Sequence, residues 1–191
     1  PALVVCMLQW MVAEWSCATP GGARRVVAAA AVAHIVLWLG WLRSNETFSL
    51  SWDDVSVTPP KDGPRKGLPD GVGVIELRLL PETKSNRTRV ADVVISYLCA
   101  SGLAPGLWFA RLSRLWPSKA PNAPLIRGSD GRRWTSRLYR HRFLYPWLYE
   151  LRRSGDPFLQ AFSDVPGNRI EDKYWSCGSY RRGGRTSSSR R

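Results

Sequence analysis

The side chains of this 191-residue chain that could do chemistry are mainly arginines and lysines. Arg181, Arg182 and Arg185 lie in a run with two glycines, and such basic runs commonly bind phosphate. Arg43 follows a long apolar segment, where a guanidinium caps a helix end or binds an anion. Lys84 lies in a turn-forming segment, which by itself is typical of a solvated lysine. The chemistry that these residues suggest is the binding of phosphate groups.

The basic residues are concentrated in the second half of the chain. Lys and Arg number 28 against 15 Asp and Glu, a formal net charge of +13. Residues 1–60 have a net charge of −1, residues 61–126 of +5 and residues 127–191 of +9. Because Lys and Arg gain affinity for nucleic acid by releasing phosphate counterions, this asymmetry indicates a polyanionic partner, with nucleic acid as the leading class. The alternative from charge alone is a basic surface that keeps the chain in solution.

Cysteine and histidine give no indication of a metal centre. The four cysteines are Cys6, Cys17, Cys99 and Cys177. Their wide spacing, without a CxxC pair, excludes a zinc ribbon and a cysteine-dense secreted scaffold and fits a reducing compartment. His34 lies in an apolar segment and is expected in the core, whereas His141 lies between two arginines and is expected at the surface. The ten tryptophans are expected to pack mainly in the core.

The elements that must position these residues begin with helices. Leu3–Trp15 is predicted to be the first helix, and Val26–Leu42 to lie in a second helix that ends near Gly40. The 17 apolar residues from Val26 to Leu42 are at the short limit for a membrane span, contain a histidine and have arginines on both sides, so a buried helix is predicted. A short membrane protein is the alternative. Ser44–Leu50 is predicted to be a short helix with Ser44 or Asn45 as its N-cap.

A small sheet is predicted to follow these helices. Trp52–Val57, Val72–Leu80 and Arg87–Val90 are the expected strands. Residues 61–71 are expected to form a mobile loop, and residues 81–86 a turn.

Three more helices complete the predicted order. They are expected at Ala91–Ala100, at Leu107–Trp116 and at Trp134–Arg153, the last kinked by Pro146 and ended near Gly155. The order of helices, sheet and helices predicts an α+β fold, mainly helical, with a small three-stranded antiparallel sheet.

Three separated segments, at residues 39–55, 82–90 and 179–186, together resemble the catalytic domain of the tyrosine recombinases, the phage-integrase family. Residues 39–55 resemble its first signature. In that signature a helix ends at a glycine, and an arginine follows it. A glutamate and the pattern Leu-x-Trp-x-Asp-Val come next. Gly40, Arg43 and Glu46 occupy the first three of these positions. Residues 82–90 are similar to the family's β-hairpin, with Lys84 at the position of its lysine. Residues 179–186 are similar to the second arginine box in its mobile-element form, in which Arg181 takes the position of the catalytic arginine.

The resemblance implies a role for each matched residue. Arg43 and Arg181 would bind the non-bridging oxygens of a scissile phosphate through forked, charge-assisted hydrogen bonds. Lys84 would protonate the departing 5′-oxygen, and Glu46 would orient an arginine. Further DNA-phosphate contacts are expected from Arg87, Arg182 and Arg185. No metal and no other cofactor is implied, because a phosphotyrosine bond conserves the energy of the broken phosphodiester.

The chain also departs from the family's pattern. Gly178 stands at the position of the box histidine, and no tyrosine of the chain is assigned as nucleophile, since Tyr180 would point away from the phosphate that its neighbour binds. We expect residues 1–186 to be a partial catalytic domain of a longer, mobile-element protein and residues 187–191 a disordered tail. This domain is expected to bind double-stranded DNA without cutting it.

Several wider expectations depend on the same resemblance. A full-length form would break and rejoin DNA through a 3′-phosphotyrosine and act as a homo-oligomer on paired sites. Neither a membrane nor a small-molecule cofactor is expected as a partner. The protein is expected to be intracellular, and nuclear if its host is eukaryotic. The alternative is a non-catalytic DNA- or RNA-binding remnant of a mobile element, which Gly178 favours.

Overall fold

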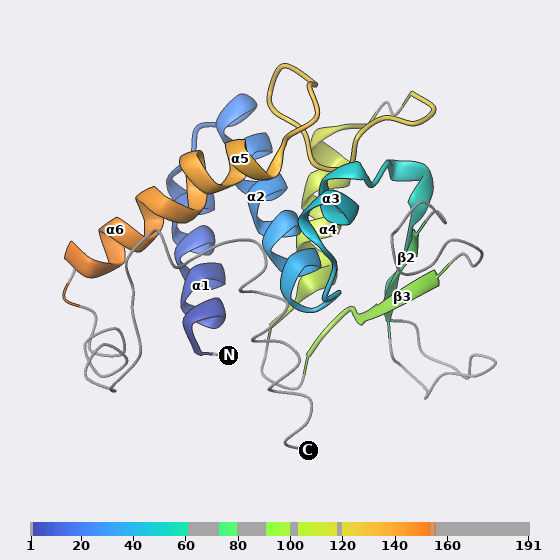
Figure 1. Cartoon of the computed structure of the whole chain (residues 1–191), viewed down its shortest axis with the longest axis horizontal. Helices are drawn as coiled ribbons and strands as arrows, with labels where there is room; N and C mark the ends of the chain where they lie inside the picture. The colour runs from blue at the N-terminus through green and yellow to red at the C-terminus, as the bar shows by residue number, and fades with distance from the viewer. Residues whose placement is uncertain are drawn as a thin grey trace.

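Helices come first along the chain, then a small sheet and then further helices, which is the order that the sequence predicts (Figure 1). The structure, a computed structural model, describes residues 2–60, 73–79, 91–99, 103–117, 120–153 and 155. Strands β1, β2 and β3 form one antiparallel sheet in that order. The predicted α+β class with three antiparallel strands is therefore confirmed. The predicted loop at 61–71, the turn at 81–86 and the tail at 187–191 lie outside the described residues.

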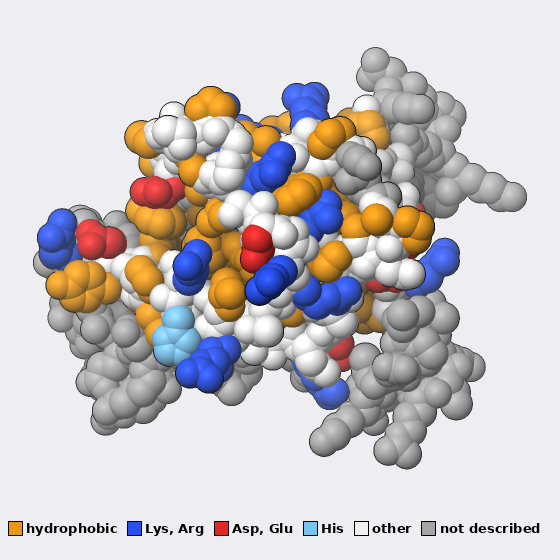
Figure 2. All heavy atoms as spheres, turned by 90° about the horizontal axis from the view of Figure 1, so that it is seen from above, with side chains coloured by type: hydrophobic (Ala, Val, Ile, Leu, Met, Phe, Trp, Pro, Cys, Tyr) orange, Lys and Arg blue, Asp and Glu red, His pale blue; other side chains and the backbone are white. Residues whose placement is uncertain are grey.

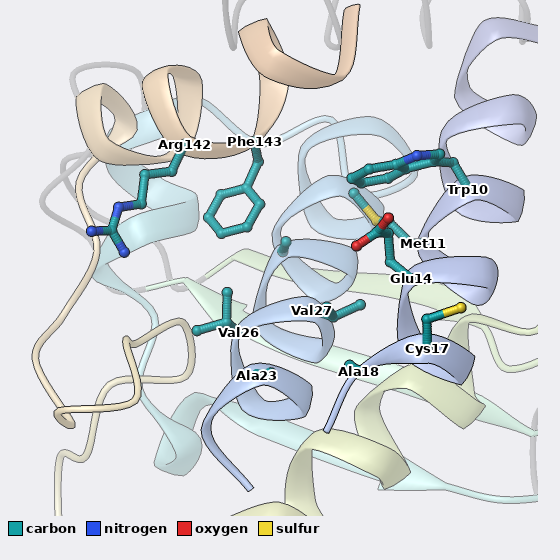
Figure 3. Close-up of a pocket in the computed structure, with 11 residues that line it drawn as sticks. Trp10, Met11, Glu14, Cys17, Ala18, Ala23, Val26, Val27, Arg142 and Phe143 are labelled. Atoms are coloured by element: carbon teal, nitrogen blue, oxygen red, sulfur yellow. The ribbon is translucent and has the colours of Figure 1, made fainter. Parts of the chain in front are cut away.

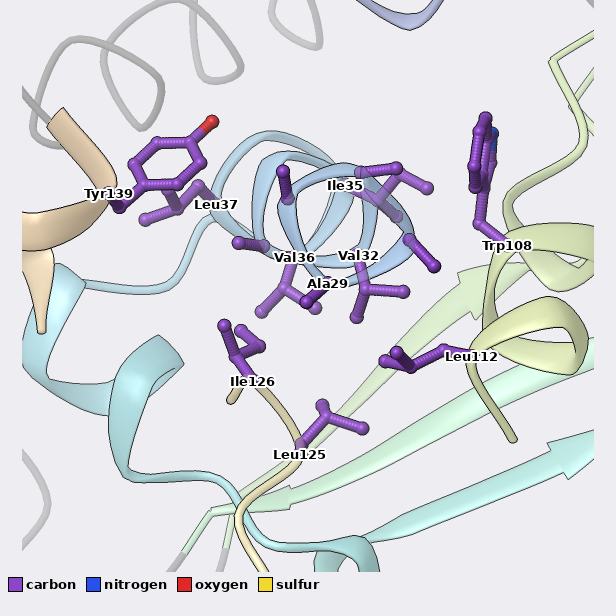
Figure 4. Close-up of a cluster of buried hydrophobic side chains, with 14 of the residues drawn as sticks. Ala29, Val32, Ile35, Val36, Leu37, Trp108, Leu112, Leu125, Ile126 and Tyr139 are labelled. Atoms are coloured by element: carbon purple, nitrogen blue, oxygen red, sulfur yellow. The ribbon is translucent and has the colours of Figure 1, made fainter. Parts of the chain in front are cut away.

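Two helices that run in opposite directions begin the fold (Figure 1). Helix α1 covers Ala2–Cys17 and α2 covers Gly22–Trp38, as the apolar runs predict. Ten consecutive residues of α2, from Ala28 to Leu37, are buried. A helix that is apolar on every side is buried on every side, and α2 is the central element of the core (Figure 4). Within the described part of the chain, no helix has the length and hydropathy to cross a bilayer.

Helix α2 ends at Trp38 with Leu39 as its C-cap, and Gly40 follows at a close backbone approach. A Cβ atom on Gly40 would lie 2.7 Å from the carbonyl oxygen of Val36, so any larger residue would displace the main chain. Helix α3 then covers Ser44–Ser49. Its N-cap residue is Arg43, so the predicted cap at Ser44 or Asn45 was wrong by one or two positions. The cap moves because the Glu46 carboxylate accepts a hydrogen bond from the Arg43 main chain.

The sheet packs its alternate residues against the helices. A 3-10 turn, η1 (Trp52–Asp54), precedes β1 (Val55–Thr58), so only the second half of the predicted strand 52–57 is extended. Strand β2 covers Val74–Leu79 and buries every second residue as predicted, including Ile75 and Leu77.

The third strand is not where the sequence predicts it. Strand β3 covers Ala91–Ser96, within the segment Ala91–Ala100 that was predicted to be a helix. Ile95 pairs with Ile75 of β2 and is buried, whereas Val94 is 58% exposed. Three consecutive β-branched residues beside an unpaired strand edge favour pairing over helix formation. The predicted strand Arg87–Val90 lies outside the described residues.

The last helices enclose the core. Helix α4 (Pro105–Leu115) confirms the predicted helix at 107–116 and packs against α2. The predicted helix Trp134–Arg153 is three consecutive pieces, namely α5 (Ser136–Tyr139), the π-helical turn η2 (Arg140–Leu144) and α6 (Tyr145–Arg153). Pro146 has no N–H to donate to a helical hydrogen bond. The kink expected at this proline takes the form of the wider π-helical turn η2 just before it.

Main-chain hydrogen bonds join the connection between α4 and α5 to residues 50–52. The N–H groups of Trp52 and Leu125 donate to the carbonyl oxygens of Ala123 and Leu50 at 2.9 and 3.0 Å. Residues 127–133 then turn back on themselves, since Gly128 N–H donates to the Arg132 carbonyl at 2.9 Å. This turn places Arg127 beside the start of α2.

Candidate functional site

Arg43 has a fixed main chain at the junction of α2 and α3. Its N–H donates to Oε2 of Glu46 at 2.7 Å, and its carbonyl accepts from Thr47 N–H at 2.9 Å. Both Arg43 and Glu46 are half-buried. The carboxylate therefore orients Arg43 through the backbone at this junction.

The other residues predicted for the site lie outside the described part of the chain. They are Lys84, Arg87, Gly178, Arg181, Arg182 and Arg185. The structure consequently gives a position to Arg43 and Glu46 alone, and no distance joins them to the remaining predicted residues.

The structure shows a basic site that the sequence analysis missed. Four arginines lie over three indole rings where α2 starts and α4 ends, and we call this group the arginine–tryptophan cluster. Its members are Arg24, Arg25, Arg111, Arg127, Trp15, Trp108 and Trp116. Arginine side chains gather on the face of the molecule that carries the start of α2 and the α4–α5 connection (Figure 2).

The guanidinium groups of the cluster lie at cation–π distances. The Cζ atoms of Arg25 and Arg127 are 4.3 and 3.9 Å from the centroid of the Trp116 ring. Arg111 lies 4.6 Å from the Trp108 ring, and both Arg24 and Arg111 lie within 5.5 Å of the Trp15 ring. Such contacts are each worth about 0.5–2 kcal/mol and hold the flexible side chains in place.

Arg127 has a positive charge in an unusually buried position. Its residue is 7% exposed, and burial, followed by repulsion from Arg25, lowers the pKa of its guanidinium. The described residues contain two ion pairs, Arg132–Asp130 at 3.8 Å and Arg153–Glu150 at 3.5 Å, both of them exposed. No carboxylate in this part of the structure therefore pairs with the cluster.

The start of α2 adds main-chain donors to this positive region. Gly21 is the N-cap with φ of 97°, no side chain caps the helix, and its first turn has no acidic residue. Gly22 lies so near the α4–α5 connection that a Cβ on it would be 3.5 Å from the Cβ of Ser129. The signal in the sequence was the pair of glycines at 21–22, followed after Ala23 by two arginines.

One cavity beside described residues is lined mainly by apolar side chains and lacks a catalytic set. It has a volume of about 370 Å³ and lies between α1, α2 and the π-helical turn (Figure 3). Glu14 and Arg142 are the charged residues of its lining, and Cys17 is its thiol. Among the residues with described positions, no three His, Cys, Asp or Glu side chains are grouped so that they could hold a metal ion.

The two histidines lie where the sequence predicts. His34 is fully buried, with Nδ1 3.3 Å from the hydroxyl oxygen of Tyr139. His141 is exposed and lies edge-on to the Tyr145 ring at 5.3 Å. The tryptophan prediction is confirmed for four rings that are buried in the core, those of Trp52, Trp108, Trp134 and Trp147.

Comparison of the chain with protein-family models, with curated proteins and with solved structures gives no match.

Proposed function

We propose that this chain binds double-stranded DNA. The observation that carries the proposal is the gathering of arginines on one face, around the start of α2, without carboxylate partners among the described residues. The whole chain adds to this attraction with a net charge of +13. Cations without carboxylate partners attract a polyanion and release its counterions, and cation–π contact with the indole rings restricts the guanidinium groups to fixed positions.

We further propose that the DNA-binding domain is of the tyrosine-recombinase type. The support is the resemblance of three segments together with the fixed main chain of Arg43. In this proposal Arg43 and Arg181 bind the non-bridging oxygens of one phosphate, and Lys84 gives a proton to the 5′-oxygen that leaves. In a full-length form, a tyrosine oxygen would form the new bond to phosphorus as the bond to the 5′-oxygen breaks.

A non-catalytic nucleic-acid-binding domain is the second candidate function. Gly178 favours it, because glycine has no group that could replace an imidazole at that position. No tyrosine of the chain is assigned as nucleophile, so both candidates predict binding of DNA without cleavage by residues 1–191.

Fluorescence anisotropy of a labelled DNA duplex, followed over a series of NaCl concentrations, tests the DNA-binding proposal. The logarithm of the association constant should fall linearly with the logarithm of salt concentration, with a slope of about −0.9 for each neutralised phosphate. A single-stranded RNA of equal length serves as competitor. The proposal is wrong if the folded chain has no affinity for duplex DNA at low salt.

The proposal of a recombinase-type domain has a sharper test in single variants. Arg43→Ala and Arg181→Ala should weaken DNA binding more than Arg78→Ala, which removes an exposed arginine from β2. In a domain that binds by charge alone, all three variants should instead show the same small loss of affinity for DNA. In each of them the slope of the logarithm of the association constant against the logarithm of salt concentration should fall in magnitude by about one. Incubation with nicked duplex, followed by denaturing electrophoresis, should show no covalent protein–DNA product, and such a product would contradict the expected lack of cleavage.

A further inference from the structure

We infer that Arg127 and the first turn of α2 form a binding site for one phosphate group. The site extends the proposed DNA binding. The phosphate site itself is argued from the contacts below, and the assignment of that phosphate to the DNA backbone rests on the proposed function. Arg25 and Trp116 complete the site with two more hydrogen-bond donors.

The polar atoms that meet at this place are donors without an acceptor. Nε and Nη2 of Arg127, Nε of Arg25 and Nε1 of Trp116 are all buried and have no hydrogen-bond partner among the described residues. A buried donor without a partner destabilises the folded state, and a buried charge without a partner destabilises it more. Cation–π contact with one shared ring offsets only part of this cost. The missing partner is therefore a ligand that accepts hydrogen bonds and has a negative charge.

Arg127 lies in the turn that packs beside the start of α2. Its guanidinium lies over the same indole ring as that of Arg25, which is in the first turn of this 17-residue helix. The main-chain N–H groups of a first turn have no partner within the helix, and the helix dipole favours an anion beside them. Gly21, Gly22 and Ala23 are exposed, and a Cβ on Gly21 would meet no atom within 4 Å. There is thus open space beside the main-chain N–H groups of this turn.

The acidic residue nearest to Arg127 in the sequence is already engaged elsewhere. Asp130 accepts a hydrogen bond from Arg132 N–H at 3.0 Å, and its carboxylate is 3.8 Å from the Arg132 guanidinium. The turn at 128–131 holds that pair at the exposed side of the loop.

Two guanidinium groups and a helix N-terminus suit a phosphate better than a carboxylate. A phosphate offers several oxygens in a tetrahedral arrangement, so forked donors and main-chain N–H groups can bind it at the same time. The phosphodiester of DNA and free inorganic phosphate share this chemistry, and the experiment below separates them.

Thermal unfolding of the full chain, with inorganic phosphate as the probe, tests the site. In phosphate-free buffer at constant ionic strength, added phosphate should raise the Tm of the wild type, and chloride should not. Arg127→Met should weaken phosphate binding, measured by calorimetric titration, by at least about tenfold. Without phosphate, Arg127→Met should have a Tm equal to or above that of the wild type, because it removes a buried charge that lacks a partner.

Two more variants keep the test decisive. Arg132→Met removes an exposed arginine from the same loop and should leave phosphate binding unchanged. Arg25→Gln removes the second guanidinium from a half-buried position and should weaken phosphate binding even if Arg127→Met fails to fold. The site is overturned if the wild type gains no phosphate-specific stability, or if a folded Arg127 variant binds phosphate as the wild type does.

Duplex DNA as a second probe separates the two proposals. If DNA backbone is the source, phosphate should compete with DNA more strongly than chloride, and Arg127→Met should lower the salt slope by about one. Phosphate binding without DNA affinity would contradict the proposed function and support the site as one for free phosphate. DNA affinity without phosphate-specific stabilisation would support the proposed function and overturn the site.

Discussion

Glu46 stabilises the start of α3 through one main-chain hydrogen bond, and it thereby fixes Arg43. The carboxylate oxygen is 2.7 Å from the Arg43 nitrogen, in a helix of six residues that has few hydrogen bonds of its own. An acceptor at this position satisfies a donor that the helix leaves open. If Arg43 binds a DNA phosphate, its affinity depends on this bond without any contact between Glu46 and DNA.

Substitution of Glu46 measures the contribution of that bond. Glu46→Ala should lower the free energy of unfolding by about 1 kcal/mol in urea denaturation, and Glu46→Gln, which keeps an acceptor oxygen, should lose clearly less. Glu76→Ala, on the exposed side of β2, is the control and should change stability by less than about 0.5 kcal/mol. Equal losses in the alanine and glutamine variants would mean that the charge of Glu46 matters and the hydrogen bond does not.

The chain directly after strand β3 packs closely against the start of helix α4. Gly106, in the first turn of α4, donates its N–H to the Tyr97 carbonyl at 3.0 Å. A Cβ on Gly106 would overlap the ring of Tyr97, including the ring atom bonded to its Cβ. The end of the sheet therefore packs directly on helix backbone, which helps to hold residues 91–96 as a strand.

Helix propensity and packing make opposite predictions for Gly106→Ala. Propensity alone would stabilise α4 by about 1 kcal/mol, whereas the overlap with Tyr97 should destabilise the protein by about 1–3 kcal/mol. We expect a net loss in urea denaturation. In a Tyr97→Ala background, the same substitution should be neutral or stabilising, and additive losses in the double variant would exclude the ring as the cause.

On the scale of the whole molecule, the packing of the helices depends on small residues in α2. Ala28 to Ala31 and Ala33 are at most 1% exposed, and side chains of α4 and of the α4–α5 connection lie around this helix (Figure 4). Alanine at these positions lets neighbouring backbones approach closely, and it leaves no room for a larger side chain. The same packing brings the end of α4 to the start of α2, where the arginine–tryptophan cluster forms.

Overpacking of α2 tests this arrangement. Ala29→Leu should lower the free energy of unfolding by about 1–3 kcal/mol and should also weaken phosphate binding, because it displaces α4 from α2. Ala13→Leu makes the same change at an exposed position of α1 and should have little effect on either measurement. A neutral Ala29→Leu would show that the core around α2 is loosely packed.

Much of the fold follows from local patterns in the sequence. The apolar runs predict α1, α2 and α4, alternation predicts β2, and burial of His34 follows from its apolar neighbours. These features depend on residues close together in the chain, and backbone propensity and periodicity act over that range. The net charge of +13 likewise determined the class of partner that we propose.

Only the tertiary structure decided the state of 91–96 and the position of the basic site. Residues 91–96 are a strand because β2 offers an edge, and that partner lies in another segment. Arg25 and Arg127 are separated by about a hundred residues and meet over Trp116, which no local pattern indicates. Pairing and burial depend on distant partners, so their outcome is determined only when the chain folds.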